Sequence, residues 1–192
     1  MLKKQEAIDL FKRSSALLEG HFRLTSGKHS NQYMQCAQVL QYPEETEKLA
    51  RHIAEAFQDD RVELVVGPAM GGIIVAYEVA RQLKIPAIFT ERQDGEMCLR
   101  RGFAIQPGQR VLVVEDVVTT GGSVQEVIQV VGAAGGEVVG VGVLVDRSGG
   151  QIDFGTKTQA VLNLDILSWE AEQCPLCAEG KLPVIKPGSR SV

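Results

Sequence analysis

The sequence lacks several features that would assign it directly to a class of protein. No apolar run approaches the roughly 20 residues needed to span a membrane, and the N-terminal segment MLKKQEAIDLFKRSSALLEG lacks the continuous apolar core of a signal peptide. Positive charge is not in excess, because the formal net charge is −4, so the composition does not favour polyanions. We therefore expect a cytoplasmic protein with no membrane and no nucleic-acid partner.

Cysteine and histidine are also scarce. Four cysteines in 192 residues do not indicate a disulfide framework, although Cys174 and Cys177 form a CPLC motif. Reduced thiols in a tight turn, a zinc site completed by the same pair of a second subunit, and a redox pair are all compatible with this motif, since structural zinc usually has four ligands. His21, His29 and His52 match no catalytic position, and we expect them at the surface or in packing.

Two common phosphate-binding motifs are absent, namely G-x-x-x-x-G-K-[ST] and G-x-G-x-x-G. Present instead is an alternation that starts at Val62, in which the apolar runs VELVV, PAIFTE, RVLVVED, EVVGVGVLVD and AVLNLDIL are separated mainly by helical patterns. One such helix carries Ile73, Ala76, Tyr77 and Ala80 on a single stripe. Continuous apolar strands that alternate with helices predict an α/β fold whose parallel sheet is covered on both faces.

The N-terminal part of the chain has a different pattern. Residues 1–18 are predicted to form an amphipathic helix, and HFRLTSGKHSNQYMQCAQVL has a turn-rich centre typical of a hairpin. Pro43 is expected to open a further helix. We predict a single domain over residues 1–192, with a small hood formed mainly by residues 1–42 and the C-terminal segment.

Paired acids stand at the end of one predicted strand. Glu115 and Asp116 come directly before the turn 119–123, which is TTGGS, and Ser123 with Glu126 predicts a capping box for the following helix. The glycines allow close approach of a ligand, and the amides, the helix dipole and the hydroxyls all favour a phosphate. The carboxylates suit vicinal sugar hydroxyls or Mg²⁺. The alternative is a pair of solvated acids beside a capped, glycine-rich connection.

A second glycine-rich turn, GPAMGG at residues 67–72, also lies between a predicted strand and a helix. In open α/β sheets ligands bind at the carboxyl ends of the strands, so this turn, EDVVTTGGS and DRSGG are expected to converge there. Two separate anion sites indicate a ligand that carries phosphate groups at both ends, with a pentose between them.

Four segments, in this order, carry a resemblance to a known family: FRLTSGKHSNQY, GPAMGG, EDVVTTGGS and VDRSGG. Together they resemble the type I phosphoribosyltransferases, and within them the orotate-specific enzymes, over nearly the whole chain. The resemblance implies the type I phosphoribosyltransferase fold and the substrates 5-phosphoribosyl 1-diphosphate (PRPP) and orotate. It also implies Mg²⁺ carried by PRPP or pyrophosphate, without a metal ligand from the protein.

The resemblance implies a role for each matching residue. Acids hold the ribose hydroxyls, the turn after them wraps the 5-phosphate, and the earlier turn holds pyrophosphate. The implied PRPP-binding residues are Glu115, Asp116, Val117, Val118, Thr119, Thr120, Gly121, Gly122, Ser123, Ala69, Met70, Gly71 and Gly72. The implied orotate-binding residues are Thr119, Arg147, Lys28 and Tyr33, where the planar guanidinium matches the carboxylate of orotate.

A mobile loop and a homodimer with shared active sites are implied as well. In many relatives this loop carries lysine and histidine into the neighbouring subunit's site, whereas TERQDGEMCLRRGF keeps Arg92 and has neither residue type. Arg100 and Arg101 could supply the positive charge, and a solvated turn or salt bridge is the alternative for that pair. The candidate catalytic residues are Asp116, Glu115, Arg92, Arg100 and Arg101.

Two other functions remain open at this point. A purine phosphoribosyltransferase would share EDVVTTGGS but have a different hood. A regulator that senses PRPP without catalysis would bring a nucleic-acid-binding domain or a basic face, and neither the segment before Val62 nor the net charge of −4 favours one.

Overall fold

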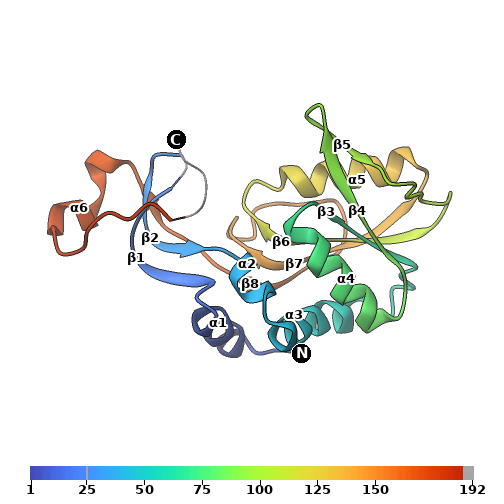
Figure 1. Cartoon of the computed structure of the whole chain (residues 1–192), viewed down its shortest axis with the longest axis horizontal. Helices are drawn as coiled ribbons and strands as arrows, with labels where there is room; N and C mark the ends of the chain where they lie inside the picture. The colour runs from blue at the N-terminus through green and yellow to red at the C-terminus, as the bar shows by residue number, and fades with distance from the viewer. Residues whose placement is uncertain (25, 188–192) are drawn as a thin grey trace.

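The computed structural model describes residues 1–24 and 26–187 of the chain. It shows a larger body built around one sheet and a smaller part on one side, formed by the two ends of the chain (Figure 1). Within the described residues, no helix is both long and apolar enough to cross a membrane.

The central sheet has six strands in the order β5-β4-β3-β6-β7-β8. All neighbouring pairs are parallel except β4 and β5, which form an antiparallel hairpin. The strands are β3 (Leu64–Pro68), β4 (Ala87–Gln93), β5 (Glu96–Leu99), β6 (Arg110–Val118), β7 (Glu137–Asp146) and β8 (Thr158–Asn163). The predicted parallel sheet is therefore confirmed, with an added antiparallel edge strand.

Helices cover both faces of this sheet, as predicted. They are α1 (Lys4–Arg13), α2 (Ala37–Leu40), α3 (Pro43–Ala56), α4 (Gly71–Leu83) and α5 (Gly122–Ala133). Leu112 and Val114 of β6 pack with α1, α3 and α4 in one apolar cluster, whereas Val111 and Val113 pack with α5 in another. Because side chains alternate across a strand, the unbroken apolar run of β6 fills both cores.

A separate three-stranded antiparallel sheet, which we call the hood sheet, has the order β1-β2-β9. It consists of β1 (Leu17–Arg23), β2 (His29–Met34) and β9 (Ser168–Trp169). The chain then continues through the short helices η1 (Ala171–Gln173) and α6 (Pro175–Glu179) and returns to β1, where Arg23 N donates to Ile185 O at 2.8 Å. The first and last parts of the chain thus lie side by side (Figure 1).

Three expectations about local structure were wrong. The first helix ends at Arg13 rather than near residue 18, because Ser15 adopts a left-handed φ of 57° and the Ser14 hydroxyl donates to Leu10 O and Phe11 O. Tyr77 is 68% exposed, since α4 instead packs on the sheet through a stripe that contains Val75 and Val79.

The segment TERQDGEMCLRRGF was expected as a mobile loop, but it contributes the strand β5. The turn that joins the two strands is Asp94–Gly95, and both residues have positive φ, 54° and 91°. Asp-Gly between two extended runs is a strong hairpin signal, so this strand could have been found in the sequence.

Candidate functional site

Two turns meet at the carboxyl ends of the neighbouring strands β3 and β6. A Cβ atom added to Gly71 would lie 2.4 Å from Asp116 Oδ2, so the turn 67–72 lies directly against the carboxylate. Gly67 and Gly72 are also packed too closely for side chains, since a Cβ on Gly67 would lie 2.4 Å from Gly72 O. The glycines of GPAMGG thus allow this backbone to approach the end of β6.

The two acids lie in different surroundings at the end of β6. Glu115 is buried, with 8% of its surface exposed, whereas Asp116 is half-buried. Burial, followed by the neighbouring Asp116, raises the pKa of Glu115 to about 9. Glu115 Oε1 accepts a hydrogen bond from the Asp116 amide at 3.0 Å, and Asp116 Oδ1 accepts one from the Val117 amide at 2.8 Å. Among the described residues, neither carboxylate forms an ion pair.

The turn 119–123 lines a small cavity of about 60 Å³. Its lining residues are Glu115, Val117, Val118, Thr119, Thr120, Gly121, Gly122, Ser123 and Val124. Gly121 has φ 77°, a conformation that disfavours other residues, and a Cβ there would lie 3.0 Å from the Phe154 ring. In the described part of the chain, the amides of Thr119 and Thr120 donate no hydrogen bond, so they are free to bind an anion.

The predicted capping box was wrong. The residue before α5 is Gly121, and no side chain caps the helix. Glu126 does not reach back to the helix start but pairs with Arg92 of β4. The absence of a side-chain cap leaves the helix N-terminus open toward the cavity, where its amides favour negative charge.

Arg147 follows β7 and joins this edge of the sheet. Its amide donates to Val118 O at 2.8 Å, which fixes it beside the turn 119–123. The side chain is largely withdrawn from solvent, and burial lowers its pKa. Its Nε atom is buried and has no hydrogen-bond partner among the described residues. An unpaired buried guanidinium nitrogen is costly unless a ligand completes it.

Cys36 is a residue of this site that sequence reasoning missed. It is 2% exposed, and its Sγ lies 3.7 Å from Asp116 O. The pKa of this thiol is raised well above its usual value, first by burial and then by Asp116 and Glu115. The one available signal was its position two residues after the strand that carries Tyr33.

The two hood residues expected at the base lie at opposite ends of β2. Tyr33 is near the body of the protein, close to Arg147, and it packs on Phe22 with ring centroids 5.9 Å apart. Lys28 precedes the other end of the strand, and its Nζ pairs with Glu170 Oε1 at 3.1 Å. At a rise of about 3.3 Å per residue, the Cα atoms of Tyr33 and Lys28 are roughly 16 Å apart.

The three arginines considered for the mobile loop all have acidic partners. Arg92 pairs with Glu126 of α5. Arg100 and Arg101 both pair with Glu91 of β4, at 3.5 Å and 3.1 Å, and Arg101 also lies over the Phe89 ring. The side chains of Arg92, Arg100 and Arg101 are 48%, 47% and 60% exposed, whereas that of Glu91 is 17% exposed. Because solvent reaches all three guanidinium groups, each pair is weak and can exchange for a stronger anionic partner.

Of the two positions expected for the histidines, at the surface or in packing, the structure shows the second. All three are buried, with exposures of 1% for His21, 7% for His29 and 6% for His52. His52 accepts from the Leu2 amide through Nδ1 at 3.1 Å. His21 and His29 lie next to Cys174 and Cys177 in the same chain. The sequence did not indicate this proximity, because about 150 residues separate the histidines from the CPLC motif.

Comparison with known proteins gives consistent matches. The model of the family described as "Phosphoribosyl transferase domain" matches residues 35–170. Orotate phosphoribosyltransferase of Desulforamulus reducens is 58% identical over 191 residues, which cover 100% of both chains. The enzyme of the same name from Heliobacterium modesticaldum is 59% identical, covering 99% of this chain and 100% of its own.

Solved structures show the same architecture. Orotate phosphoribosyltransferase of Mycobacterium tuberculosis in complex with inorganic phosphate superposes with a TM-score of 0.69 at 28% identity. The match covers 84% of this chain and 95% of that one. The six-stranded sheet with helices on both faces is therefore the type I phosphoribosyltransferase fold.

Proposed function

The chain belongs to the orotate phosphoribosyltransferases, pentosyltransferases of pyrimidine biosynthesis, and we propose that the cleft at the end of β6 binds PRPP and orotate. The products are orotidine 5′-phosphate and pyrophosphate. The observation that carries this assignment of the cleft is the close approach of Asp116 to the turn 67–72, since a Gly71 Cβ would lie 2.4 Å from its carboxylate. One carboxylate thus stands between two anion-binding turns.

Different residues around this carboxylate bind different parts of the PRPP molecule. Asp116 and Glu115 bind the ribose hydroxyls, Asp116 through its carboxylate oxygens and Glu115, which keeps its proton in the folded protein, through the carbonyl oxygen of its neutral carboxyl group. The turn 119–123 binds the 5-phosphate through its free amides and the uncapped start of α5. Val117 and Val118 line the same cavity and exclude water from the sugar.

Ala69, Met70, Gly71 and Gly72 bind the diphosphate on the other side of Asp116. Mg²⁺ carried by PRPP fits here, because the carboxylate oxygens of Asp116 lie against this turn and hard oxygen donors suit that ion. The bound ion supplies positive charge against the negative charge of the departing pyrophosphate. The Ala69 amide donates to Thr90 O at 2.7 Å, so the turn supplies the backbone amides of the residues after Ala69, and it keeps the diphosphate in line with the ribose.

Orotate binds between the hood and the end of β7. Arg147 receives the carboxylate of the base, which completes its unpaired Nε atom. Thr119 contacts the base from the end of β6, and Tyr33 covers it from β2. Lys28, at the far end of β2, reaches this site through a movement of the hood that breaks its exposed ion pair with Glu170.

The chemical step needs positioning and electrostatics more than covalent catalysis. The bond from the anomeric carbon to the diphosphate breaks with oxocarbenium-like charge on the ribose, and a ring nitrogen of orotate forms the new bond to that carbon. The proton of this nitrogen leaves to solvent or to an oxygen of the departing pyrophosphate, so no side chain is assigned as a general base. Arg92, Arg100 and Arg101 stabilise the leaving group after the loop that carries them closes and excludes water. Their present partners, Glu126 and Glu91, hold this loop in the open position.

We assign the working form to a homodimer in which each loop serves the neighbouring cleft. An exposed apolar stripe at the start of α4 supports this, since Met70, Ile74 and Tyr77 are 82%, 45% and 68% exposed. Contiguous apolar surface of this kind marks an interface. Mixing Asp116→Asn with an Arg100→Ala/Arg101→Ala variant should restore activity that neither has alone, whereas additive residual rates would show that each site is complete within one chain.

A direct assay tests the proposed substrates and site. The protein is incubated with PRPP and either orotate, adenine, hypoxanthine or xanthine, with and without Mg²⁺, and loss of orotate absorbance and release of pyrophosphate are followed. Of the four bases, orotate is expected to be the one that reacts with PRPP, and this reaction is expected to require Mg²⁺. Turnover with a purine base in place of orotate, or an equal rate after Mg²⁺ removal, would contradict the proposal.

A further inference from the structure

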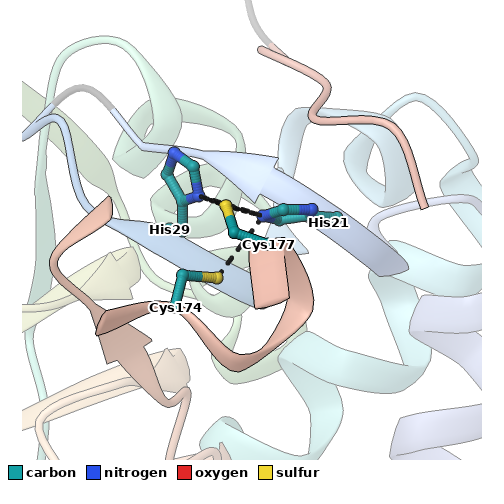
Figure 2. Close-up of side chains that lie close together, drawn as sticks. All are labelled: His21, His29, Cys174 and Cys177. Carbon is teal, nitrogen blue, oxygen red and sulfur yellow. Dashed lines mark hydrogen bonds between the residues drawn. The ribbon is translucent and has the colours of Figure 1, made fainter. Parts of the chain in front are cut away.

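Four side chains from opposite ends of the chain converge in the hood, away from the cleft at the end of β6. His21 comes from β1 and His29 from β2, whereas Cys174 and Cys177 come from the segment around α6. Figure 2 shows the two rings and the two sulfur atoms turned toward one another between the strands and the C-terminal segment. Their four nearest nitrogen and sulfur atoms all lie within 4.8 Å of one another.

The separations between these atoms are close to those of a tetrahedral metal site. Zn–N distances of about 2.0–2.1 Å and Zn–S of about 2.3 Å place tetrahedral ligands about 3.4 Å apart for N–N and about 3.6 Å for N–S. Here His21 Nε2 lies 2.9 Å from His29 Nδ1, 3.4 Å from Cys174 Sγ and 3.6 Å from Cys177 Sγ. His29 Nδ1 lies 3.2 Å from Cys177 Sγ. The two other separations, from Cys174 Sγ to His29 Nδ1 and to Cys177 Sγ, are within 4.8 Å, so a small movement of the side chains toward one another admits an ion at the centre.

A contact on the other ring nitrogen of His21 fixes the orientation of this imidazole. His21 Nδ1 lies 3.2 Å from Leu182 O, and a carbonyl can only accept, so Nδ1 carries the proton. This tautomer leaves a lone pair on Nε2, directed at the other three groups. A ring nitrogen that donates to a backbone carbonyl behind the metal is the usual support for a histidine ligand.

Burial makes a purely hydrogen-bonded cluster a poor account of these residues. His21, His29 and Cys174 are 1%, 7% and 3% exposed. Sulfur is a weak donor and acceptor, so this arrangement compensates poorly for the removal of imidazole from water. One metal ion satisfies all four groups at once, with each thiol giving up its proton.

We propose that His21, His29, Cys174 and Cys177 bind one Zn²⁺ within a single chain. Two thiolates and two imidazoles in tetrahedral positions are typical zinc ligands, and a site closed by four protein ligands is structural rather than catalytic. The ion would tie the C-terminal segment to β1 and β2. Next to it, His29 pairs with Trp169 in the short strand β9, and Lys28 pairs with Glu170, so the metal organises the hood that covers the base.

Metal analysis of the purified protein is the first test. The chain is expressed without a histidine tag, purified without added metal, and its zinc content is measured by mass spectrometry. About one equivalent per chain is expected for wild type and for Cys98→Ser, a cysteine far from the cluster. Cys177→Ser is expected to lose most of the zinc. Zinc content in wild type no higher than in Cys177→Ser, with none taken up on reconstitution, would overturn the proposal.

A spectroscopic test does not depend on how well the serine variant folds. Zinc is removed from wild type under reducing conditions and replaced by Co²⁺, whose absorption reports tetrahedral sulfur and nitrogen ligands. His29→Cys should keep the metal with three thiolates, and its thiolate charge-transfer absorption should increase by about one half. A cobalt spectrum typical of six oxygen ligands, or a Cys174–Cys177 disulfide in freshly isolated protein, would rule out the zinc site.

Discussion

The central sheet and the hood sheet bury different kinds of residue. In the central sheet most of the buried side chains of β3, β6 and β7 are valine and leucine, and two apolar clusters enclose them. In the hood sheet the buried residues include His21, His29 and Ser30. Within the described residues, the apolar clusters reach the hood only at its near end, through residues such as Leu17 and Met34.

This difference follows from size. A six-stranded sheet with helices on both faces removes enough apolar surface from water to fix its strands. A three-stranded sheet whose third strand has two residues is too small for this and needs a local cross-link. The central sheet therefore supplies rigid positions for the sugar and phosphates, while the hood supplies a movable cover for the base.

The largest effect is expected where a side chain of the rigid sheet touches the sugar. Asp116→Asn should lower kcat/KM about 10²–10³-fold, with an unchanged thermal midpoint, because the side chain is half-buried at the end of a strand. The exposed Asp59→Asn is the matched control. Orotate absorbance and thermal unfolding measure the two quantities. A near-normal rate in Asp116→Asn would contradict the assignment of ribose binding to Asp116.

The next effect separates the base from the sugar. Arg147→Ala should raise the KM for orotate about 10–100-fold, the cost of a lost charge-assisted hydrogen bond, and change the KM for PRPP much less. Arg147→Lys keeps the charge but not the planar pair of donors, so it should recover part of the loss. Steady-state kinetics with each substrate varied in turn checks this. Equal changes in both constants would place Arg147 outside the base site.

A smaller effect is expected from a single methyl group between the two turns. Gly71→Ala adds a Cβ 2.4 Å from the Asp116 carboxylate, which must turn away, so kcat/KM should fall about 10-fold through misplaced contacts. Gly132→Ala is the control, since a Cβ there meets nothing within 4 Å and an alanine in α5 should stabilise the helix by about 0.5–1 kcal/mol. If both variants had wild-type activity, the contribution of Asp116 to kcat/KM would not depend on its contact with this turn.

The last effect is a pH dependence of stability inside the sheet, and it concerns folding rather than activity. The pKa of Glu115 is raised from 4.5 to about 9, so between these values the folded protein keeps a proton that the unfolded chain releases. Its contribution to stability is complete below about pH 4.5 and is lost as the pH rises toward 9. The slope cannot exceed about 1.4 kcal/mol per pH unit for one proton.

Glu115→Gln should remove this contribution, because glutamine does not titrate. Its free energy of unfolding, measured in denaturant from pH 5 to 8.5, should rise relative to wild type as the pH increases. The exposed Glu44→Gln should follow wild type throughout. Parallel curves for wild type and Glu115→Gln would mean that Glu115 is ionised in the folded protein.

The sheet was more predictable than the hood because its signals are local. Runs such as RVLVVED identify buried strands, and glycine-rich turns after them identify anion sites, without knowledge of distant residues. Even the missed strand β5 had a local signal in Asp94–Gly95. The error over Ser123 and Glu126 was of another kind, because Glu126 could cap α5 but forms an ion pair with Arg92 of a different strand.

The residues that sequence reasoning missed are those whose partners are far away in the chain. Cys36 lies beside Asp116 across 80 residues, and His21 lies beside Cys174 across 153. No periodicity or motif contains such a pair, since each residue has an ordinary local environment. Only the return of the C-terminal segment to β1 brings the second pair together.

The sequence alone determined the parallel sheet, its two glycine-rich turns and the acids at the end of β6, because hydrophobic periodicity and turn chemistry act over a few residues. The tertiary structure decided which groups share a site: the approach of Gly71 to Asp116, the unpaired Arg147, and the meeting of two histidines with two cysteines. Those depend on chain closure over long distances, where packing of the whole core rather than any local preference sets the positions.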